Sequence, residues 1–350
     1  MKKNLIKLLV LALVLCLALS LAACSKGSDS AQQGSGNADN LVSIELDYDS
    51  VLMVTKDGNA YFMDEEHADE PYLAAQNVKS AFLGSDALRS VVDYIDNNGN
   101  YYSNSVNMKN GGVYENELRY ENVEQIVPIM DFAIYRSPDG KVYIDKFAAA
   151  FVSASAAYGG TTELHDHELV AENGQTVVTI AYRGAYLNDK GELWGLEDNE
   201  WKLLCDNVAQ VCETNGMVPL VLKKDGTLCW TTGSDGTVAF DEGVDEIYAH
   251  TNLYRKGDRF YRVISNYSNN WEIVTYSLDN IKTPIWTDGS AFVYIGTDSQ
   301  IHCTKLSSER IENGWNETAF YDAAYPASVD SMDEIYNFLK TADDIQPEEG

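Results

Sequence analysis

The 350-residue sequence is poor in basic side chains. It has 25 Lys and Arg against 54 Asp and Glu, which gives a formal net charge of −29. Nucleic acid, anionic lipid headgroups and phosphate-rich wall polymers would all repel such a chain. We therefore expect no nucleic-acid partner. The charge permits cationic partners or divalent metals, and it is also explained by a highly solvated surface.

The sequence also lacks the short motifs of known catalytic and metal sites. No GxSxG elbow, P-loop or catalytic cysteine signature is present. Among 54 carboxylates, choosing two as a glycosidase pair would be arbitrary. No CxxC motif occurs, and the four cysteines after Cys24 are Cys205, Cys212, Cys229 and Cys303. They are interpreted as disulfides of an exported chain or as buried free thiols, and the sequence gives no connectivity.

The N-terminus has the pattern of an export signal. Lys2, Lys3 and Lys7 form a basic segment, and residues 8–20 are a nearly unbroken apolar run. That run is shorter than the about 20 residues that a transmembrane helix needs. The pattern therefore predicts a secretory signal.

Leu21, Ala22, Ala23 and Cys24 resemble the lipobox of bacterial lipoproteins. The two alanines let a peptidase approach the backbone, and the resemblance implies cleavage before Cys24 and a diacylglycerol group on its sulfur. We therefore expect a signal peptide at residues 1–23, and a mature protein held by lipid at the extracytoplasmic face of the cell membrane. This covalent lipid is the one attached group that we expect, with no cofactor. The alternative is an ordinary signal peptide with an incidental cysteine.

Residues 25–40 contain no aromatic or branched aliphatic side chain. Such a segment cannot bury a core, so we expect residues 24–40 to be a flexible tether behind the lipidated cysteine. Removal of residues 1–23 takes away three lysines and no acid, so the formal charge changes from −29 to −32.

A repeated pattern runs through the rest of the chain. Apolar segments start directly after Asn or Gly, near residues 41, 78, 123, 174, 208, 244 and 281. Downstream of each start, two apolar strands meet at a turn pair: Asp57-Gly58, Asn98-Gly99, Asp139-Gly140, Lys190-Gly191, Asp225-Gly226, Lys256-Gly257 and the degenerate Asp298-Ser299. These pairs predict β-hairpins with tight two-residue turns of the primed types. Three residues past the turn glycine stands a large ring in five units: Tyr61, Tyr102, Tyr143, Trp194 and Phe260.

The seven starts divide residues 41–327 into units of about 41 residues, close to the roughly 40–50 residues of a four-stranded propeller blade. Seven lies within the usual number of blades, and one such unit cannot bury both faces of its sheet alone. We predict an all-β fold, a seven-bladed β-propeller with degenerate repeats. The alternative is a pair of two-sheet β-sandwiches with coincidental hairpins.

The unit at residues 208–233 resembles the repeat of the regulator-of-chromosome-condensation propellers. The shared features are Val208-Ala209, Val211, Gly216, Leu222, Asp225-Gly226, Leu228, Trp230 and Gly233, and GELWG at 191–195 matches the second half of the repeat. The Gly-x-x-His element of that family is not kept, because Pro219 stands where the histidine would fall. The resemblance implies the propeller fold and does not carry over nucleotide-exchange activity.

The C-terminal piece, residues 328–350, has a different pattern. Ser331 and Glu334 form a capping-box pattern. Apolar residues then follow at helical spacing: Met332, Ile335, Tyr336 and Leu339. We expect one short amphipathic helix docked on the propeller, with a frayed acidic tail after Thr341.

The strongest metal candidate is Glu163, His165 and His167. On a strand these alternate residues would share one face and converge on an ion such as Zn²⁺. No HExxH motif or fourth ligand accompanies them, so a solvated loop or strand face is the preferred interpretation.

Three functions remain as hypotheses. The first is a non-catalytic binding or scaffold propeller, with an extracellular or periplasmic protein or glycan as partner. It is favoured by the anchor, the tether, the repeats and the missing catalytic motifs. The second is an extracellular carbohydrate-active enzyme that uses the 22 Tyr, the six Trp and the carboxylates to line a sugar cleft. The third is a surface metal-binding protein that uses residues 163–167.

Overall fold

The computed structural model describes the chain from Leu41 to Ile345, apart from residues 48, 66–69, 86–89, 108–112, 130–131, 147–167, 181–182, 199, 213–218, 232–236, 250, 266–270, 289–290 and 313. The chain divides into two units, residues 1–35 and 36–350, and every described residue belongs to the second. In that unit, strands account for the long elements up to Pro326 and one α-helix follows. The prediction of an all-β fold with a C-terminal helix is therefore confirmed.

The strands form sheets in which chain neighbours pair antiparallel. The first two sheets are β1 Leu41–Asp47, β2 Ser50–Thr55, β3 Asn59–Met63 and β4 Tyr72–Gln76, then β5 Val78–Ser85, β6 Ser90–Asp96, β7 Tyr101–Asn107 and β8 Val113–Tyr120. The next two are β9 Gln125–Ile129, β10 Phe132–Arg136, β11 Val142–Lys146 and β12 Glu168–Ala171, then β13 Gly174–Ile180, β14 Arg183–Asn188, β15 Leu193–Glu197 and β16 Glu200–Cys205. The fifth is β17 Val208–Cys212, β18 Leu220–Lys223, β19 Leu228–Thr231 and β20 Thr237–Asp241.

The remaining strands belong to one eight-stranded sheet, which consists of two four-stranded meanders. They are β21 Glu246–Tyr248, β22 Leu253–Lys256, β23 Arg259–Ser265 and β24 Trp271–Tyr276, then β25 Ile281–Asp288, β26 Ala291–Gly296, β27 Gln300–Ile311 and β28 Gly314–Pro326. β28 joins the two meanders by pairing parallel with β24, where Val274 faces Trp315 and Tyr276 faces Glu317.

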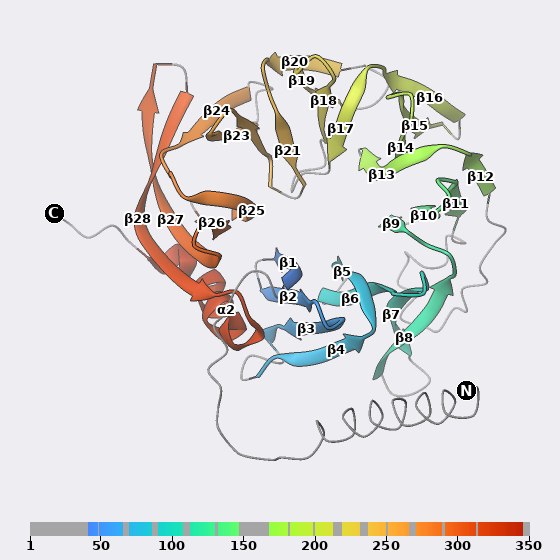
Figure 1. Cartoon of the computed structure of the whole chain (residues 1–350), viewed down its shortest axis with the longest axis horizontal. Helices are drawn as coiled ribbons and strands as arrows, with labels where there is room; N and C mark the ends of the chain where they lie inside the picture. The colour runs from blue at the N-terminus through green and yellow to red at the C-terminus, as the bar shows by residue number, and fades with distance from the viewer. Residues whose placement is uncertain are drawn as a thin grey trace, which may run out of the picture. The chain divides into compact units, whose positions relative to one another are not determined.

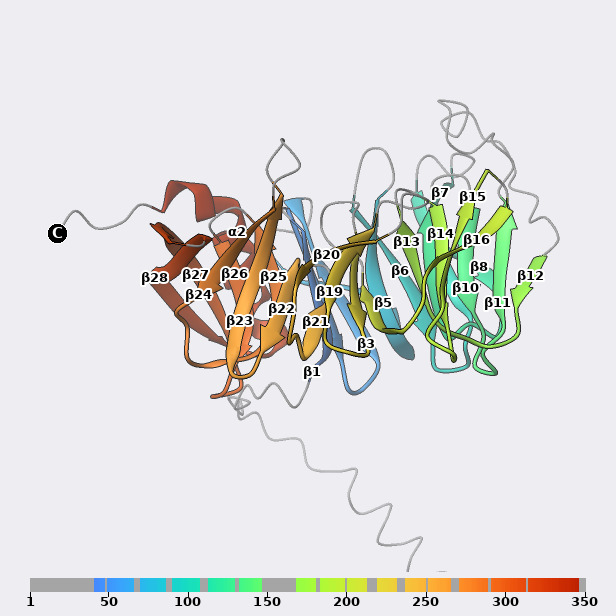
Figure 2. The ribbon, with the colours of Figure 1, turned by 90° about the horizontal axis from the view of Figure 1, so that it is seen from above.

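Within this unit the sheets follow one another around a ring, and the first strand of each lies innermost (Figure 1). Innermost strands contact across successive sheets, as β1 does with β5, β13 with β17 and β17 with β21, and β1 also contacts β25. From the side, the strands run between the two broad faces of the ring (Figure 2). The first sheet thus meets the last one, although they are separated by most of the chain.

The core lies between neighbouring sheets. Residues of the second strands are buried almost continuously, as in β2, because both faces of that strand are covered. One cluster joins Leu187 and Val178 to Val208 and Val221 of the following sheet, and comparable clusters occupy the other junctions. A sheet of this kind is stable through its neighbours, which is the energetic reason for the repeat.

The hairpins between second and third strands correct the predicted turn type in the first five sheets. In the second sheet the Gly99 N–H donates to Asp96 O at 3.0 Å and the Asp96 N–H donates to Asn100 O at 2.9 Å. Gly99 has a φ of +83°, whereas Asn98 is not in the left-handed region. This is a type I turn followed by a left-handed glycine, so the predicted primed two-residue turn is wrong here. The hairpin after β22 does have two loop residues, but they are Gly257 and Asp258, because Lys256 pairs with Arg259.

The turn glycine of each of the first five sheets also forms a hydrogen bond to the next sheet. The glycine carbonyl accepts the N–H of the residue at which the following unit starts, at 2.7–3.0 Å: Gly58 to Val78, Gly99 to Val123, Gly140 to Gly174, Gly191 to Val208 and Gly226 to Val244. The asparagine before the start is left-handed at Asn77, Asn122 and Asn207, which this residue type tolerates. The recurrent Asn-apolar pattern of the sequence therefore marks a hydrogen-bonded link between sheets.

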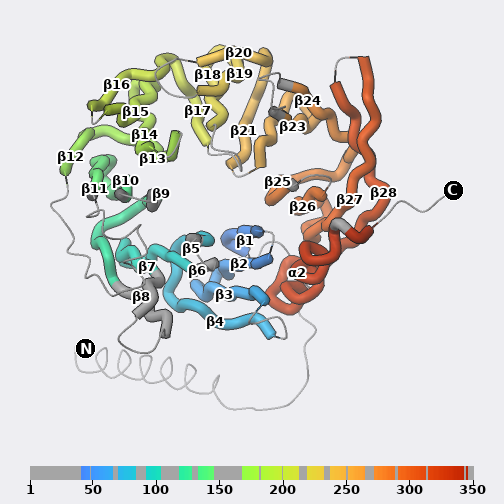
Figure 3. The backbone as a smooth tube through the Cα atoms, turned by 180° about the vertical axis from the view of Figure 1, so that it is seen from behind, coloured from blue at the N-terminus to red at the C-terminus, as the bar shows by residue number. Residues whose placement is uncertain are grey.

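Helix α2, Met332–Thr341, closes the ring. Its Met332, Ile335, Tyr336 and Leu339 are buried, as predicted, against residues of β2, β3, β26 and β27. The tube view shows α2 beside β27 and β28 at the boundary with the first sheet (Figure 3). Ser331 is the N-cap, but its side chain makes no capping hydrogen bond, so the capping-box prediction is wrong. Ala342 after the helix is buried rather than frayed, and residues 346–350 lie outside the described part.

Candidate binding surface on the inner strands

The innermost strands share a bulge at their first residues. In five sheets the ladder skips one residue directly after the start, and the skipped residues are Val42, Lys79, Gln175, Ala209 and Lys282. A bulge leaves its extra residue unpaired, bends the strand and turns the side chain out of the ladder. All five skipped side chains are exposed.

We call these positions and the residues that follow them the collar. Its pairs are Val42-Ser43, Lys79-Ser80, Glu124-Gln125, Gln175-Thr176, Ala209-Gln210, Asp245-Glu246 and Lys282-Thr283. Glu124 and Asp245 hold the corresponding place without a bulge, because their N–H groups donate to Arg136 O and Arg255 O. The second residue of every pair is a hydroxyl, amide or carboxylate side chain. The collar is therefore a polar surface on the strands nearest the centre of the ring (Figure 1).

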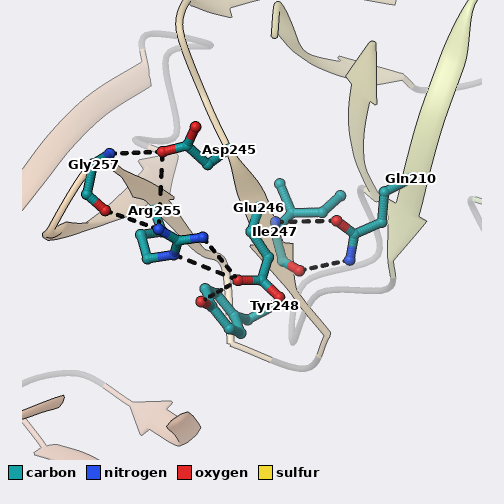
Figure 4. A network of polar contacts seen from close by, with 7 residues as sticks. All are labelled: Gln210, Asp245, Glu246, Ile247, Tyr248, Arg255 and Gly257. Carbon is teal, nitrogen blue, oxygen red and sulfur yellow. Dashed lines mark hydrogen bonds and ion pairs between the residues drawn. The ribbon is translucent and has the colours of Figure 1, made fainter. Parts of the chain in front are cut away.

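Two glutamines of the collar fix its shape. Gln125 Nε2 donates to Val177 O at 3.0 Å, and the Val177 N–H donates to Gln125 Oε1 at 3.1 Å. Gln210 holds Ile247 in the same way, at 2.8 and 3.3 Å (Figure 4). Each amide thus pairs with the backbone of the next innermost strand, so neighbouring collar pairs are held in register.

Arg255 of β22 forms ion pairs with both carboxylates of the acidic pair Asp245-Glu246 (Figure 4). Arg255 Nη2 lies 3.4 Å from Glu246 Oε2, and Arg255 Nη1 donates to Gly257 O at 2.9 Å. The Gly257 N–H donates to Asp245 Oδ2 at 2.7 Å, and the Tyr248 hydroxyl donates to Glu246 Oε2 at 2.7 Å. Burial and the bond to Glu246 raise the pKa of Tyr248 to about 12. These groups are occupied by one another and are poorly suited to act as an acid or base.

A second part of the collar carries positive charge. Lys79 of β5 is ion-paired with Glu124, and Lys282 of β25 is exposed. Val42 of β1 lies on the strand between them, since β1 contacts both β5 and β25. Val42 is 52% exposed, which is unusual for an apolar side chain on an inner strand. Lys79, whose charge Glu124 balances, and Lys282 thus lie on the two inner strands that contact the strand of Val42.

His302 is the one described histidine, and it occupies the place of the repeated ring. It stacks on Tyr294 with ring centroids 4.9 Å apart. Its Nε2 lies 3.1 Å from both Asp298 carboxylate oxygens, and its Nδ1 lies 3.3 Å from those of Asp322. The pKa of Asp298 is lowered, because the hydrogen bond from the Gln300 N–H and the contact with His302 outweigh the effect of burial. The Thr304 hydroxyl also donates to Asp322 Oδ1 at 2.9 Å, so the group ties β27 to the turn before it and to β28, and we interpret it as a support of this hairpin.

The residues that the sequence singled out for chemistry are not among those described. Cys24 with Leu21, Ala22 and Ala23 lies outside the described residues, and so do Glu163, His165 and His167. In the described ranges, no group of three metal-binding side chains occurs and no helix is long and apolar enough to cross a membrane. Cys205, Cys212, Cys229 and Cys303 are buried. The collar was not predicted from the sequence, because the skipped residues of the five sheets share no chemical type.

Comparisons with known proteins support the architecture alone. No protein-family model and no curated protein matches the chain. Among solved structures, Hsv2 of Kluyveromyces lactis superimposes with a TM-score of 0.51 at 11% identity, covering 82% of this chain and 99% of that one. The described unit has a β-propeller-like fold. The sandwich alternative is not supported, and the resemblance of residues 208–233 to the regulator-of-chromosome-condensation repeat stays a prediction.

Two further similar structures have TM-scores of 0.48. One is PorZ, a bacterial surface component of the type-IX secretion system of Porphyromonas gingivalis, with 13% identity over 81% of this chain and 38% of that one. The other is virginiamycin B lyase from Staphylococcus aureus, with 11% identity over 76% of this chain and 95% of that one. At such identities the propeller carries no activity over from these proteins.

Proposed function

We propose that this protein is a lipid-anchored, extracytoplasmic propeller of seven blades that binds a protein or glycan without catalysing a reaction. The seventh blade is β25–β28, which shares a sheet with β21–β24 only through the pairing of β24 with β28. The lipobox at residues 21–24 and the core-free segment that follows it support the anchor.

The collar is the observation that carries the binding proposal. Propellers bind through side chains gathered near the axis of the ring, where loops and innermost strands meet. Here an exposed bulge recurs in five sheets, and the collar presents hydroxyl, amide and lysine groups together with the apolar side chains of Val42 and Ala209. Hydrogen-bonding groups of both kinds beside an apolar contact suit the neutral polar surface of a glycan or peptide.

Photo-crosslinking in the native host tests the binding proposal. A photoreactive residue replaces exposed Val42 or Ala209 in the collar, or exposed Leu118 or Val238 on the outer strands as matched controls. We expect a discrete adduct from the collar positions and none from the outer strands. Equal adducts from both sets, or no adduct from any position, would reject the collar as the binding surface.

The anchor is tested separately by intact-mass spectrometry of the membrane fraction. We expect a mature chain that begins at Cys24 with a diacylglyceryl mass increment. The Cys24→Ala variant is expected in the soluble fraction. A chain that begins elsewhere, or equal membrane partition of both forms, would contradict the anchor without touching the collar.

A further inference from the structure

Two thiols from neighbouring sheets meet at the junction of the fourth and fifth sheets. Cys205 is the last residue of β16, and Cys229 lies in β19 of the next sheet. Both belong to one core cluster, with exposed fractions of 7% and 1%. They come from strands that do not pair with each other, so packing between sheets brings them together.

A single hydroxyl contacts both sulfurs. Thr237 Oγ1 of β20 lies 3.9 Å from Cys205 Sγ. The same hydroxyl is a hydrogen-bond partner of Cys229, and proximity of the Cys205 thiol raises the pKa of Cys229 in addition to burial. Cys229 pairs with Ala239, two residues along β20 from Thr237, so its side chain lies on the sheet face that carries this hydroxyl.

The other described thiols lie elsewhere. Cys212 packs in the cluster between the fifth and sixth sheets, and Cys303 packs under helix α2. Burial raises the pKa of Cys303 well above its usual range, and neither Cys212 nor Cys303 shares a cluster with Cys205 and Cys229. These two residues are therefore internal controls for any reaction of Cys205 with Cys229.

We propose that Cys205 and Cys229 are a redox-active pair that closes an inter-sheet disulfide. The Cys205 thiolate, the more exposed of the two, attacks a low-molecular-weight disulfide and displaces one thiolate, which takes up a proton. The Cys229 thiolate then attacks the Cys205 sulfur of this mixed disulfide and displaces the second thiolate. Two protein thiols are oxidised to one disulfide, and the external disulfide is reduced to two thiols.

Its biological setting rests on the proposed export, since disulfides persist outside the cytoplasm. The bond would join the fourth and fifth sheets covalently. It would also close a loop between residues 205 and 229 in the unfolded state, which lowers the entropy of that state. The fourth and fifth sheets would then separate less readily in oxidising surroundings.

The test uses the full mature chain with Cys24→Ala, incubated with oxidised glutathione, then alkylated and mapped by non-reducing peptide mass spectrometry. We expect a Cys205–Cys229 cross-linked peptide and alkylated Cys212 and Cys303 after denaturation. Cys229→Ser should stop at a glutathione adduct on Cys205, and Cys205→Ser should prevent oxidation. Tm should rise by about 5 °C on oxidation and return on reduction.

Two results would overturn the proposal. One is an unchanged Tm after oxidation, together with recovery of both Cys205 and Cys229 in alkylated form. The other is cross-linking that involves Cys212 or Cys303 as often as the proposed pair. Because no binding partner enters this experiment, its failure leaves the collar proposal intact, and failed crosslinking in cells leaves this one intact.

Discussion

The junction between the two four-stranded meanders of the eight-stranded sheet differs from the five junctions before it. Each earlier junction has a hydrogen bond from the start of a blade to the carbonyl of the preceding turn glycine. Among the described residues no such bond joins Gly257 to Ile281, and the hairpin at Gly257 has a different loop length. These two meanders are joined instead by β28, a 13-residue strand that extends beyond its own meander and pairs with β24.

This replacement brings a buried ion pair. Arg262 Nη2 lies 2.8 Å from Glu317 Oε1, and Arg262 Nη1 donates to Thr287 Oγ1 at 2.8 Å. Both charged side chains are almost fully buried, at 10% and 2% exposure. The earlier sheets need one turn residue for their link, whereas this junction uses two charged side chains and one hydroxyl from three strands. A specific polar contact can therefore replace the repeated glycine hydrogen bond where a hairpin departs from the repeat.

Removal of one partner of the ion pair is expected to have the largest effect. Glu317→Ala leaves Arg262 buried without its carboxylate, and we expect a loss of about 3–5 kcal/mol in the free energy of unfolding. The double variant Arg262→Met with Glu317→Leu should lose much less, because no charge is left unpaired. Urea unfolding measures both. Equal losses would show that the ion pair is not what holds this junction.

The closing junction should be the next most sensitive. Ile335→Ala removes a fully buried side chain of α2 between the last and the first blade, at an expected cost of about 2–5 kcal/mol. Asn337→Ala is the matched control, because that side chain is exposed on the same helix. If the two variants unfold at the same urea concentration, α2 does not close the ring.

The repeated glycine link allows a direct comparison with the divergent hairpin. Gly191 and Gly257 have φ values of +82° and +57°, so alanine is strained at both, at a cost of roughly 1–2 kcal/mol. A Cβ at Gly191 would also lie 2.7 Å from Val208 O of the next blade, whereas a Cβ at Gly257 meets nothing within 4 Å. Thermal unfolding should therefore show a larger loss for Gly191→Ala than for Gly257→Ala. Identical losses would mean that the close approach at Gly191 adds nothing.

The sequence predicted the parts of the fold that depend on local chemistry. Gly99 and Asn77 occupy left-handed positions that few other residues tolerate, so the repeat was visible without an alignment. The spacing of Met332 and Ile335 likewise revealed α2. The turn type was missed because the same Asn-Gly pair suits two kinds of loop, and backbone hydrogen bonds decide between them.

The non-local features could not be predicted. Arg262 and Glu317 are 55 residues apart, and they meet because β28 continues beyond its hairpin to reach β24. The collar was hidden for another reason. Its bulge is a backbone feature, and the side chains at the skipped positions, such as Val42 and Lys79, share no chemistry.

The smallest expected effect concerns pH at the divergent junction. Burial raises the pKa of Glu317 above its usual value of 4.5, although Arg262 acts in the opposite direction. An acid whose pKa is higher in the folded state binds its proton more tightly there. Its contribution to stability is present below pH 4.5 and is lost as the pH rises through the folded pKa.

Glu317→Gln removes this titration and keeps the side-chain shape. The difference in unfolding free energy between wild type and Glu317→Gln should therefore fall as the pH rises from below 4.5 toward 7. Glu309→Gln, an exposed position on the same long hairpin, serves as the control. A difference that increases with pH would mean that the attraction of Arg262 outweighs burial. A net favourable ion pair would then hold the junction. The expected result instead means that the pairing of β28 with β24 offsets the cost of burying Glu317.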